Sequence, residues 1–250
     1  MCEVLFACDL DNTLIHSYKW RREGDICVEW LKEKAQGYMD PADARLLPVL
    51  FRRATVVPVT TRSMAQYRRI QWPEGQGPEC AVTTNGAMLL RDDVQDDAWL
   101  RQSEALARPY AGEMRTLLAA LEADGDYIRC RLVDDMYLFA YCRDGVDPKA
   151  KAAALEGRTT LETLVSGRKL YFFPTPFDKG RALERLRALF MPKLVIAAGD
   201  SVIDVPMLRA ADVALCRESV FGVVENGGKR LLEEGKSLIE IVLEIIDARR

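Results

Sequence analysis

The chain has 250 residues, of which 49% are hydrophobic and 29% charged, and its formal net charge is −3 at pH 7. This composition predicts a soluble globular protein of one or two domains, and the small net charge gives no sign of a nucleic-acid surface or a membrane partner. Seven cysteines without a Cys-x-x-Cys pair argue against both a disulfide framework and a zinc site. Since we find no signal peptide and no apolar run of membrane-spanning length, we expect a cytoplasmic protein with reduced thiols.

A short apolar run near the start of the chain leads directly into two aspartates. Residues 4–7 are apolar at consecutive positions, which predicts a strand covered on both faces. Asp9 and Asp11 follow at its carboxyl end, where open α/β sheets bind ligands. Two acids at this spacing repel each other unless a cation lies between them, which suits Mg²⁺, and an aspartate can also act as a nucleophile toward phosphorus. The alternative is a pair of loop acids that cap a helix.

Three later segments place polar side chains at the ends of further predicted strands or at the start of a helix. They are Thr60 and Thr61 after the apolar residues 56–59, Lys179 at the start of an amphipathic stretch with Leu183, Leu186 and Leu189, and Asp200 and Asp204 after residues 194–199.

The order Asp-x-Asp-x-Thr, Thr, Lys and Gly-Asp-x-x-x-Asp closely resembles the haloacid dehalogenase-like (HAD) phosphohydrolase superfamily over the whole chain. Residues 82–87, 178–183 and 206–208 resemble its Cof-type branch, which includes sugar-phosphate phosphatases. The resemblance implies an α/β fold with a Rossmann-like parallel-sheet core, formed by residues 1–87 and 176–250. A smaller α/β cap is expected as an insertion at residues 88–175.

The resemblance also implies a role for each motif residue. Asp9 would be the nucleophile that forms an aspartyl-phosphate, and Asp11 would be the general acid and base. Thr60 and Lys179 would hold the phosphoryl oxygens. The expected Mg²⁺ site comprises Asp9, the Asp11 carbonyl and Asp200, with Asp204 orienting the water shell of the metal or Lys179.

One position departs from the pattern of the branch. Ile203 occupies the place where the branch usually has an asparagine that helps to hold the phosphate. An isoleucine side chain cannot donate a hydrogen bond, so either phosphate binding is weaker or another donor, such as Ser201, replaces the asparagine.

Further residues are candidates for substrate contacts. They are Thr61, Asn85 at the end of the third core strand, and Arg129 and Arg131 in a predicted cap hairpin of residues 127–133 and 136–142. We expect Asp134-Asp135 to form the turn, so that Ile128, Cys130 and Leu132 share a buried face with Tyr137, Phe139 and Tyr141. The two arginines would lie on the other face, toward either the substrate or solvent, and Asn85 has the alternative role of shaping a turn.

Two other segments carry expectations. Residues 12–40 appear irregular and are expected to form a flap beside the site. They contain His16, the only histidine, which we interpret as packed or solvated rather than as a substrate contact. A helix at residues 238–246 carries an apolar stripe that belongs to the core or to a docking surface and leaves room for a homodimer.

These features together favour a Mg²⁺-dependent phosphatase that acts on a small phosphomonoester, such as a sugar phosphate, through an aspartyl-phosphate. A phosphomutase, which returns the phosphoryl group to a sugar hydroxyl, is one alternative. A non-catalytic regulator that binds a phosphorylated metabolite is another, and Ile203 favours it. Phosphoacceptor switch domains combine similar residues, but they are about half this length and need no cap.

Overall fold

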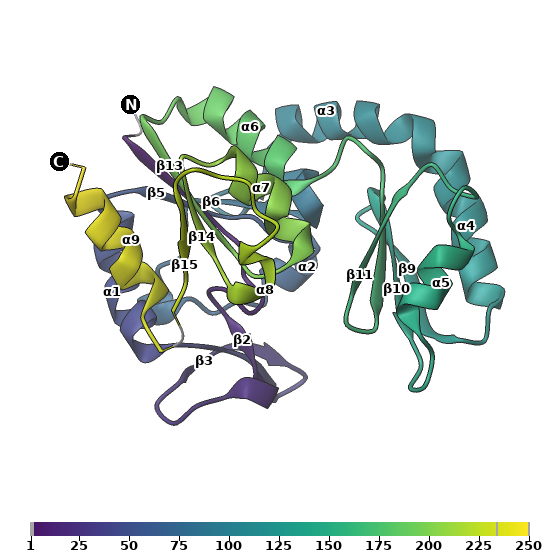
Figure 1. The fold of residues 1–250 in the computed structure, drawn as a ribbon, viewed down its shortest axis with the longest axis horizontal. Helices are drawn as coiled ribbons and strands as arrows, with labels where there is room; N and C mark the ends of the chain where they lie inside the picture. The colour runs from purple at the N-terminus through teal and green to yellow at the C-terminus, as the bar shows by residue number, and fades with distance from the viewer. Residues whose placement is uncertain (1–2, 234, 250) are drawn as a thin grey trace. The chain divides into compact units, whose positions relative to one another are not determined.

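The computed structural model describes residues 3–233 and 235–249 and divides the chain into two compact units (Figure 1). The first unit comprises the chain up to Gln95 together with the chain from Lys179, and the second is Asp96–Asp178. The expected division placed residues 88–95 in the cap and residues 176–178 in the core. In the structure, residues 88–95 lie in the first unit and residues 176–178 in the second. The reason for the first difference is that the chain reverses after β6 (Cys80–Thr83) and returns as β7 (Met88–Arg91) in an antiparallel pair.

A five-stranded parallel sheet forms the centre of the first unit, as predicted. Its order is β15-β14-β13-β1-β5. The strands are β1 (Val4–Cys8), β5 (Thr55–Pro58), β13 (Leu194–Gly199), β14 (Val213–Cys216) and β15 (Lys229–Leu231). Every residue of β1 and β13 is buried, which explains why both strands are apolar at consecutive positions.

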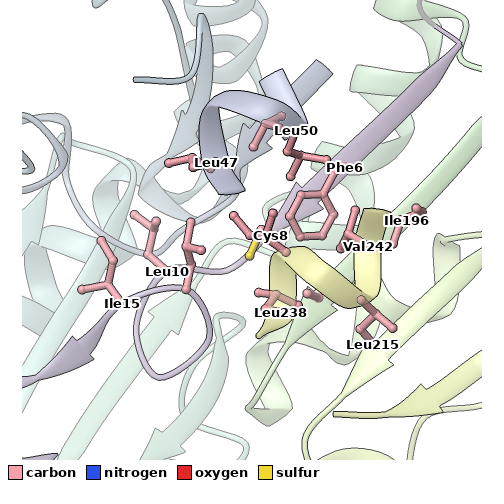
Figure 2. Close-up of a cluster of buried hydrophobic side chains, with 14 of the residues drawn as sticks. Phe6, Cys8, Leu10, Ile15, Leu47, Leu50, Ile196, Leu215, Leu238 and Val242 are labelled. Atoms are coloured by element: carbon pink, nitrogen blue, oxygen red, sulfur yellow. The ribbon is translucent and has the colours of Figure 1, made fainter. Parts of the chain in front are cut away.

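Helices cover the sheet. On one face, α1 (Pro41–Phe51) and α9 (Leu238–Asp247) pack on Phe6 and Cys8 of β1, as Figure 2 shows. The other larger helix of this unit, α6 (Lys179–Phe190), packs against α7 (Val205–Ala210) on the opposite face (Figure 1). Short helices α2 (Met64–Tyr67) and α8 (Glu218–Phe221) follow β5 and β14.

The apolar stripe of α9 is part of the core. Ile239, Val242, Ile245 and Ile246 are buried in the same hydrophobic cluster as Phe6 and Leu50. The stripe therefore gives no reason to expect a dimer through this helix. No helix within the described ranges, 3–233 and 235–249, has both the length and the apolar character needed to cross a membrane.

Residues 12–40 are not irregular, so this expectation was wrong. They form a three-stranded antiparallel sheet of β2 (His16–Ser17), β4 (Lys34–Met39) and β3 (Ile26–Leu31), with a 3-10 turn at Tyr18–Trp20. The hairpin turn places Lys32 and Glu33 at positive φ without a glycine, so it lacks the usual sequence signature of a tight turn. A second small sheet joins β6, β7 and β8 (Val94–Gln95), and Val59 and Val82 connect it to the end of β5 in a parallel bridge.

The second unit packs helices on a four-stranded antiparallel sheet, in agreement with the expected α/β cap. The helices are α3 (Asp97–Ala107), α4 (Ala111–Ala123) and α5 (Pro148–Ala154), with a 3-10 turn at Arg108–Tyr110. The sheet order is β11-β12-β10-β9, and the strands are β9 (Tyr127–Val133), β10 (Tyr137–Cys142), β11 (Glu162–Ser166) and β12 (Lys169–Phe173).

The predicted faces of the β9–β10 hairpin were wrong by one residue. Val133 pairs with Tyr137, so the loop contains Met136 as well as the two aspartates. A slip of one residue exchanges the two faces of a strand. Arg131 is consequently opposite Phe139 and Arg129 is opposite Tyr141, so the arginines share a face with the aromatic side chains rather than with solvent alone. The face that packs on α4 contains Leu138, Ala140 and Cys142.

Candidate active site

The predicted acidic residues meet at the carboxyl ends of the two central strands of the first unit. Asp9 follows β1, and its backbone N–H donates to the carbonyl of Ala198 in β13 at 2.9 Å. Asp200 and Asp204 follow the end of β13. Carboxylate oxygens of Asp9, Asp200 and Asp204 lie within 4.8 Å of one another. We call these three residues the acidic cluster.

Lys179 bridges two members of this cluster. The first residue of α6, it donates from Nζ to Oδ1 of Asp9 and to Oδ1 of Asp204, both at 2.5 Å. The three side chains are almost completely buried, with exposed fractions of 2% for Lys179, 8% for Asp9 and none for Asp204. Burial alone would lower the pKa of Lys179, but the carboxylates of Asp204 and Asp9 outweigh it and raise this pKa. The lysine is therefore a fixed positive charge.

Asp204 fixes the loop that follows β13. Its Oδ2 accepts hydrogen bonds from the backbone N–H of Ser201 at 2.9 Å, from the Ser201 hydroxyl at 2.8 Å and from the N–H of Asp200 at 3.2 Å. Both oxygens of Asp204 are thus engaged within the protein. We infer that this residue orients Lys179 and Asp200, whereas Asp9 and Asp200 are better placed to bind a cation directly.

The charges of the acidic cluster fit a divalent cation. Burial, followed by repulsion from Asp204, raises the pKa of Asp200 to about 6. The same two effects raise the pKa of Asp9, although Lys179 opposes them. Three close carboxylates with a single lysine between them lack positive charge, and Mg²⁺ prefers carboxylate oxygens in such a site. Thr13 also donates toward Oδ1 of Asp200, at 3.5 Å.

The carboxylate of Asp11 points to an arginine rather than to the acidic cluster. Arg62 donates from Nε to Oδ2 of Asp11 at 2.9 Å and from Nη2 to Oδ1 at 2.7 Å, which is a bidentate ion pair. Arg62 is itself held by Glu29 of β3, at 3.0 Å, and Glu29 also pairs with Arg69 at 2.8 Å. Burial lowers the pKa of Arg62, but Asp11 and Glu29 outweigh this effect and raise it.

The hydroxyl and amide residues lie on two loops that are tied together. Thr60 is fully buried, and its Oγ1 accepts from the backbone N–H of Arg62 at 3.1 Å. The N–H of Asn85 donates to the Thr60 carbonyl at 3.0 Å, which joins the loop after β6 to the loop after β5. Asn85 is buried at positive φ, as the turn there requires, and Thr61 is half-buried.

Ser201 is not available as the substitute donor near Ile203. A serine hydroxyl carries one hydrogen, and that of Ser201 is donated to Asp204. Ile203 itself is 7% exposed. In this arrangement the loop after β13 therefore offers no side-chain donor from either residue.

Arg129 and Arg131 belong to the second unit, in which the guanidinium of Arg131 lies over the ring of Phe139, 5.4 Å from its centroid.

Sequence reasoning missed Arg62 and Glu29. Arg62 could have been found from its position directly after the two threonines. No sequence signal indicated Glu29, because it lies in a sheet that the sequence did not predict.

No protein-family model matches the chain, and no curated protein sequence matches it. Solved structures do. The sucrose-phosphatase from Synechocystis sp. PCC6803, determined with sucrose and phosphate, has a TM-score of 0.70 and 15% sequence identity, and the alignment covers 99% of this chain and 98% of that one. A haloacid dehalogenase-like hydrolase from B. subtilis has a TM-score of 0.56 and 17% identity, with 91% and 94% covered. The chain has the HAD fold.

Another protein with the HAD fold shows the same likeness. The trehalose-6-phosphate phosphatase from Aspergillus fumigatus has a TM-score of 0.56 and 19% identity to this chain, covering 98% of this chain and 92% of that one. Each alignment spans both units. The HAD fold of this chain therefore includes the inserted unit as well as the parallel-sheet unit.

Proposed function

We propose that this protein is a Mg²⁺-dependent phosphatase that hydrolyses a small phosphomonoester through an aspartyl-phosphate at Asp9. The observation that carries the proposal is the bridge from Lys179 to Asp9 and Asp204 at the carboxyl ends of β1 and β13, beside Asp200. It combines a carboxylate nucleophile, a fixed positive charge and a cation site within one buried cluster. The HAD fold, shared with sugar-phosphate phosphatases, supports the same reaction.

In the first step, an Asp9 carboxylate oxygen attacks phosphorus in line with the bond to the leaving oxygen. That bond breaks, and Asp11 gives its proton to the leaving oxygen. Lys179, together with the Thr60 hydroxyl, stabilises the charge on the phosphoryl oxygens. Mg²⁺ held by Asp9 and Asp200 would reduce the repulsion between the carboxylate and the phosphate monoester.

In the second step, Asp11 accepts a proton from a water molecule, which attacks the phosphorus of the aspartyl-phosphate. The bond between phosphorus and the Asp9 oxygen breaks, and inorganic phosphate leaves. Arg62 holds the Asp11 carboxylate through two hydrogen bonds and would orient it for this step. To protonate the leaving oxygen in the first step, Asp11 must release at least one of these two bonds.

A sugar phosphate is the substrate class that we propose. The support comes from the names of structures with the same fold, a sucrose-phosphatase and a trehalose-6-phosphate phosphatase. Thr61 and Asn85 are proposed contacts on the side of the first unit. From the second unit we propose Arg129 and Arg131, because they lie on the aromatic face of its sheet, where guanidinium and ring surfaces suit a polyhydroxylated anion.

One observation favours a second function, the binding of a phosphorylated metabolite without turnover. Ile203 cannot donate a hydrogen bond, and the Ser201 hydroxyl is already donated to Asp204. A site with fewer donors for the phosphoryl oxygens stabilises the transition state less. Since the nucleophile, the lysine and the acidic cluster are all in place, we favour the phosphatase.

Phosphate release from a panel of sugar phosphates, nucleotides and an aryl phosphate, with Mg²⁺ and with a chelator, tests the proposal. We expect release that requires Mg²⁺ and is lost in Asp9→Asn. Asp144→Asn is the matched control, because it removes the same charge from a carboxylate whose side chain is 95% exposed in the second unit. No release from any substrate by folded protein with Mg²⁺ bound would favour the binding function instead.

A further inference from the structure

A cavity of about 480 Å³ lies next to the acidic cluster, within the first unit. Its wall toward the cluster is formed by Asn12, Thr13 and Asp200, whereas Asp9, Thr60 and Lys179 do not line it. The remaining wall comes from the β2 segment, the start of α1 and the loops after β14 and β15. This volume is typical of pockets that bind small molecules. The proposed phosphatase reaction makes no use of it.

Three basic side chains line the cavity, the same number as its acidic side chains. Arg22, Arg217 and Lys236 line it. Lys236 is largely exposed and forms an ion pair with Glu233. Arg217 is half-buried, its guanidinium forms no hydrogen bond or ion pair within residues 3–233 and 235–249, and its charge acts on the nearby Asp43. It is therefore the principal positive group in the wall.

Two of the three acidic side chains in the cavity wall, Asp40 and Asp43, accept hydrogen bonds within the protein, and the third, Asp200, belongs to the acidic cluster. Asp40 caps α1 by accepting from the N–H of Ala42 at 2.8 Å. Asp43 accepts from the Ser237 hydroxyl at 2.5 Å and from the N–H of Ile239 at 2.9 Å. Burial raises the pKa of Asp43, and the hydrogen bonds from Ser237 and Ile239 offset that rise more than the charge of Arg217 does. The guanidinium of Arg217 is thus available to an anion, which an arginine can bind through two parallel hydrogen bonds.

The cavity also has an aromatic wall. Trp20 lines it, and 70% of this residue is exposed, so the indole ring offers a flat apolar surface beside the basic groups. A tryptophan in this position suits the face of a ring, because aromatic side chains bury large flat areas.

We propose that this cavity is a second binding site, for a small phosphorylated metabolite that contains a ring. The oxyanion binds to Arg217 and the ring lies against Trp20. The proposal goes beyond the proposed phosphatase activity and does not depend on it, since binding here requires no turnover. Because Asp200 borders both the cavity and the acidic cluster, an anion in the cavity favours a cation in the cluster, and the reverse holds by linkage.

His16 provides a specific signal for a binding experiment. It lines the cavity, its Nε2 is held by Asp25 at 2.6 Å, and it is the only histidine in the chain, so its imidazole resonances can be assigned without ambiguity. We would titrate Asp9→Asn protein, in the presence of a chelator, with inorganic phosphate and separately with glucose 6-phosphate. We expect the His16 resonance to shift with each probe and to saturate.

Variants locate the site. We expect Arg217→Met to raise the Kd of both probes about tenfold or more, because a charge-assisted hydrogen bond is lost. Arg217→Lys keeps the charge and stays within a few-fold of the parent, and Arg230→Met, an exposed arginine outside the cavity, changes neither affinity. Trp20→Ala weakens the binding of glucose 6-phosphate more than the binding of inorganic phosphate.

Other outcomes would overturn the proposal. One is a His16 resonance that does not move with either probe. Another is a shift that survives Arg217→Met in folded protein but disappears in Thr60→Val, which would place the anion in the candidate active site. A failure of the phosphatase assay leaves these binding results unchanged, so the two proposals fail independently.

Discussion

Lys179 is the residue on which the buried charges depend. Replacing it with methionine leaves the carboxylates of Asp9 and Asp204 buried without a cation. Breaking a buried ion pair in this way typically costs about 3–5 kcal/mol. We therefore predict that Lys179→Met lowers the free energy of unfolding, measured in urea with a chelator present, by an amount in this range.

The matched control for this variant is Lys193→Met. The Lys193–Glu3 pair is 71% and 73% exposed, and solvent screens an exposed pair so that it contributes little to stability. If both variants lose the same small amount of stability, the cluster does not hold the buried charges as described.

Arg62 is the second residue with a testable role. Its two bonds position the Asp11 carboxylate, and lysine cannot reproduce a bidentate pair. We predict that Arg62→Lys lowers kcat for phosphate release about tenfold or more with little change in KM, because Asp11 acts in the chemical steps. Arg68→Lys, at an exposed pair with Asp93, serves as the control and keeps both constants. An Arg62→Lys enzyme with altered KM and unchanged kcat would instead assign the arginine to substrate binding.

At the residue scale, the sequence predicts only part of the site. Asp9, Asp200, Asp204 and Lys179 could be predicted to meet because each lies where a core strand ends or where the helix before the next strand begins. The bond from the Ser201 hydroxyl to Asp204 could not, because it depends on the conformation of one loop. The direction of the Asp11 carboxylate likewise depends on Arg62, a neighbour in space.

At the scale of elements, the backbone at the end of β13 lies in close contact with the side chain of Asp204. A Cβ atom at Gly199 would lie 2.4 Å from Cβ of Asp204 and 2.8 Å from its Cγ. An alanine there must displace Asp204, and with it the bonds to Lys179 and Ser201. We predict that Gly199→Ala destabilises the protein by about 1–3 kcal/mol, as overpacking does, and removes most of the phosphatase activity.

Gly222→Ala is the control for this prediction. Gly222 has helical φ and ψ angles, and nothing lies within 4 Å of a Cβ atom placed there. Thermal unfolding and phosphate release should both remain close to those of the parent protein. A Gly199→Ala variant with parental stability and turnover would contradict the packing described for Asp204.

The elements themselves were predicted unevenly, for a physical reason. Strands covered on both faces leave an unbroken apolar run, and amphipathic helices leave a periodic pattern, so β1, β13 and α9 were found. The β3–β4 hairpin turns on Lys32 and Glu33 without a glycine, and the β9–β10 loop has one residue more than expected. Turn geometry sets strand register, so one additional residue was enough to exchange the faces of Arg129 and Arg131.

At the scale of the whole molecule, a bound cation should stabilise the fold. Mg²⁺ that binds the folded acidic cluster but not the unfolded chain adds about 2.7 kcal/mol when its concentration is 100 times its Kd. We predict that Mg²⁺ raises the midpoint of thermal unfolding of the parent protein, and that Asp200→Asn removes most of this rise. Asp144→Asn, at an exposed carboxylate, should keep the full rise.

The overall arrangement of the molecule was the most predictable level. An inserted α/β unit within a parallel-sheet unit was expected from the resemblance of the motifs to the HAD superfamily. The expected boundary at residue 88 lies before the one in the structure. The Asn85-Gly86 turn resembles the end of a domain, whereas the chain returns through β7 into the first unit. Such a return depends on strand pairing, which a turn signal alone does not indicate.

The central claim is that Asp9 carries the phosphoryl group during turnover. The most direct measurement is mass spectrometry of the Asp9 peptide after rapid acid quenching of the enzyme turning over its best substrate with Mg²⁺. We predict that this peptide carries one additional phosphoryl group, which disappears in Asp9→Asn and when a chelator replaces Mg²⁺. Turnover that continues in folded Asp9→Asn, or a phosphoryl group found on a different residue, would contradict the account.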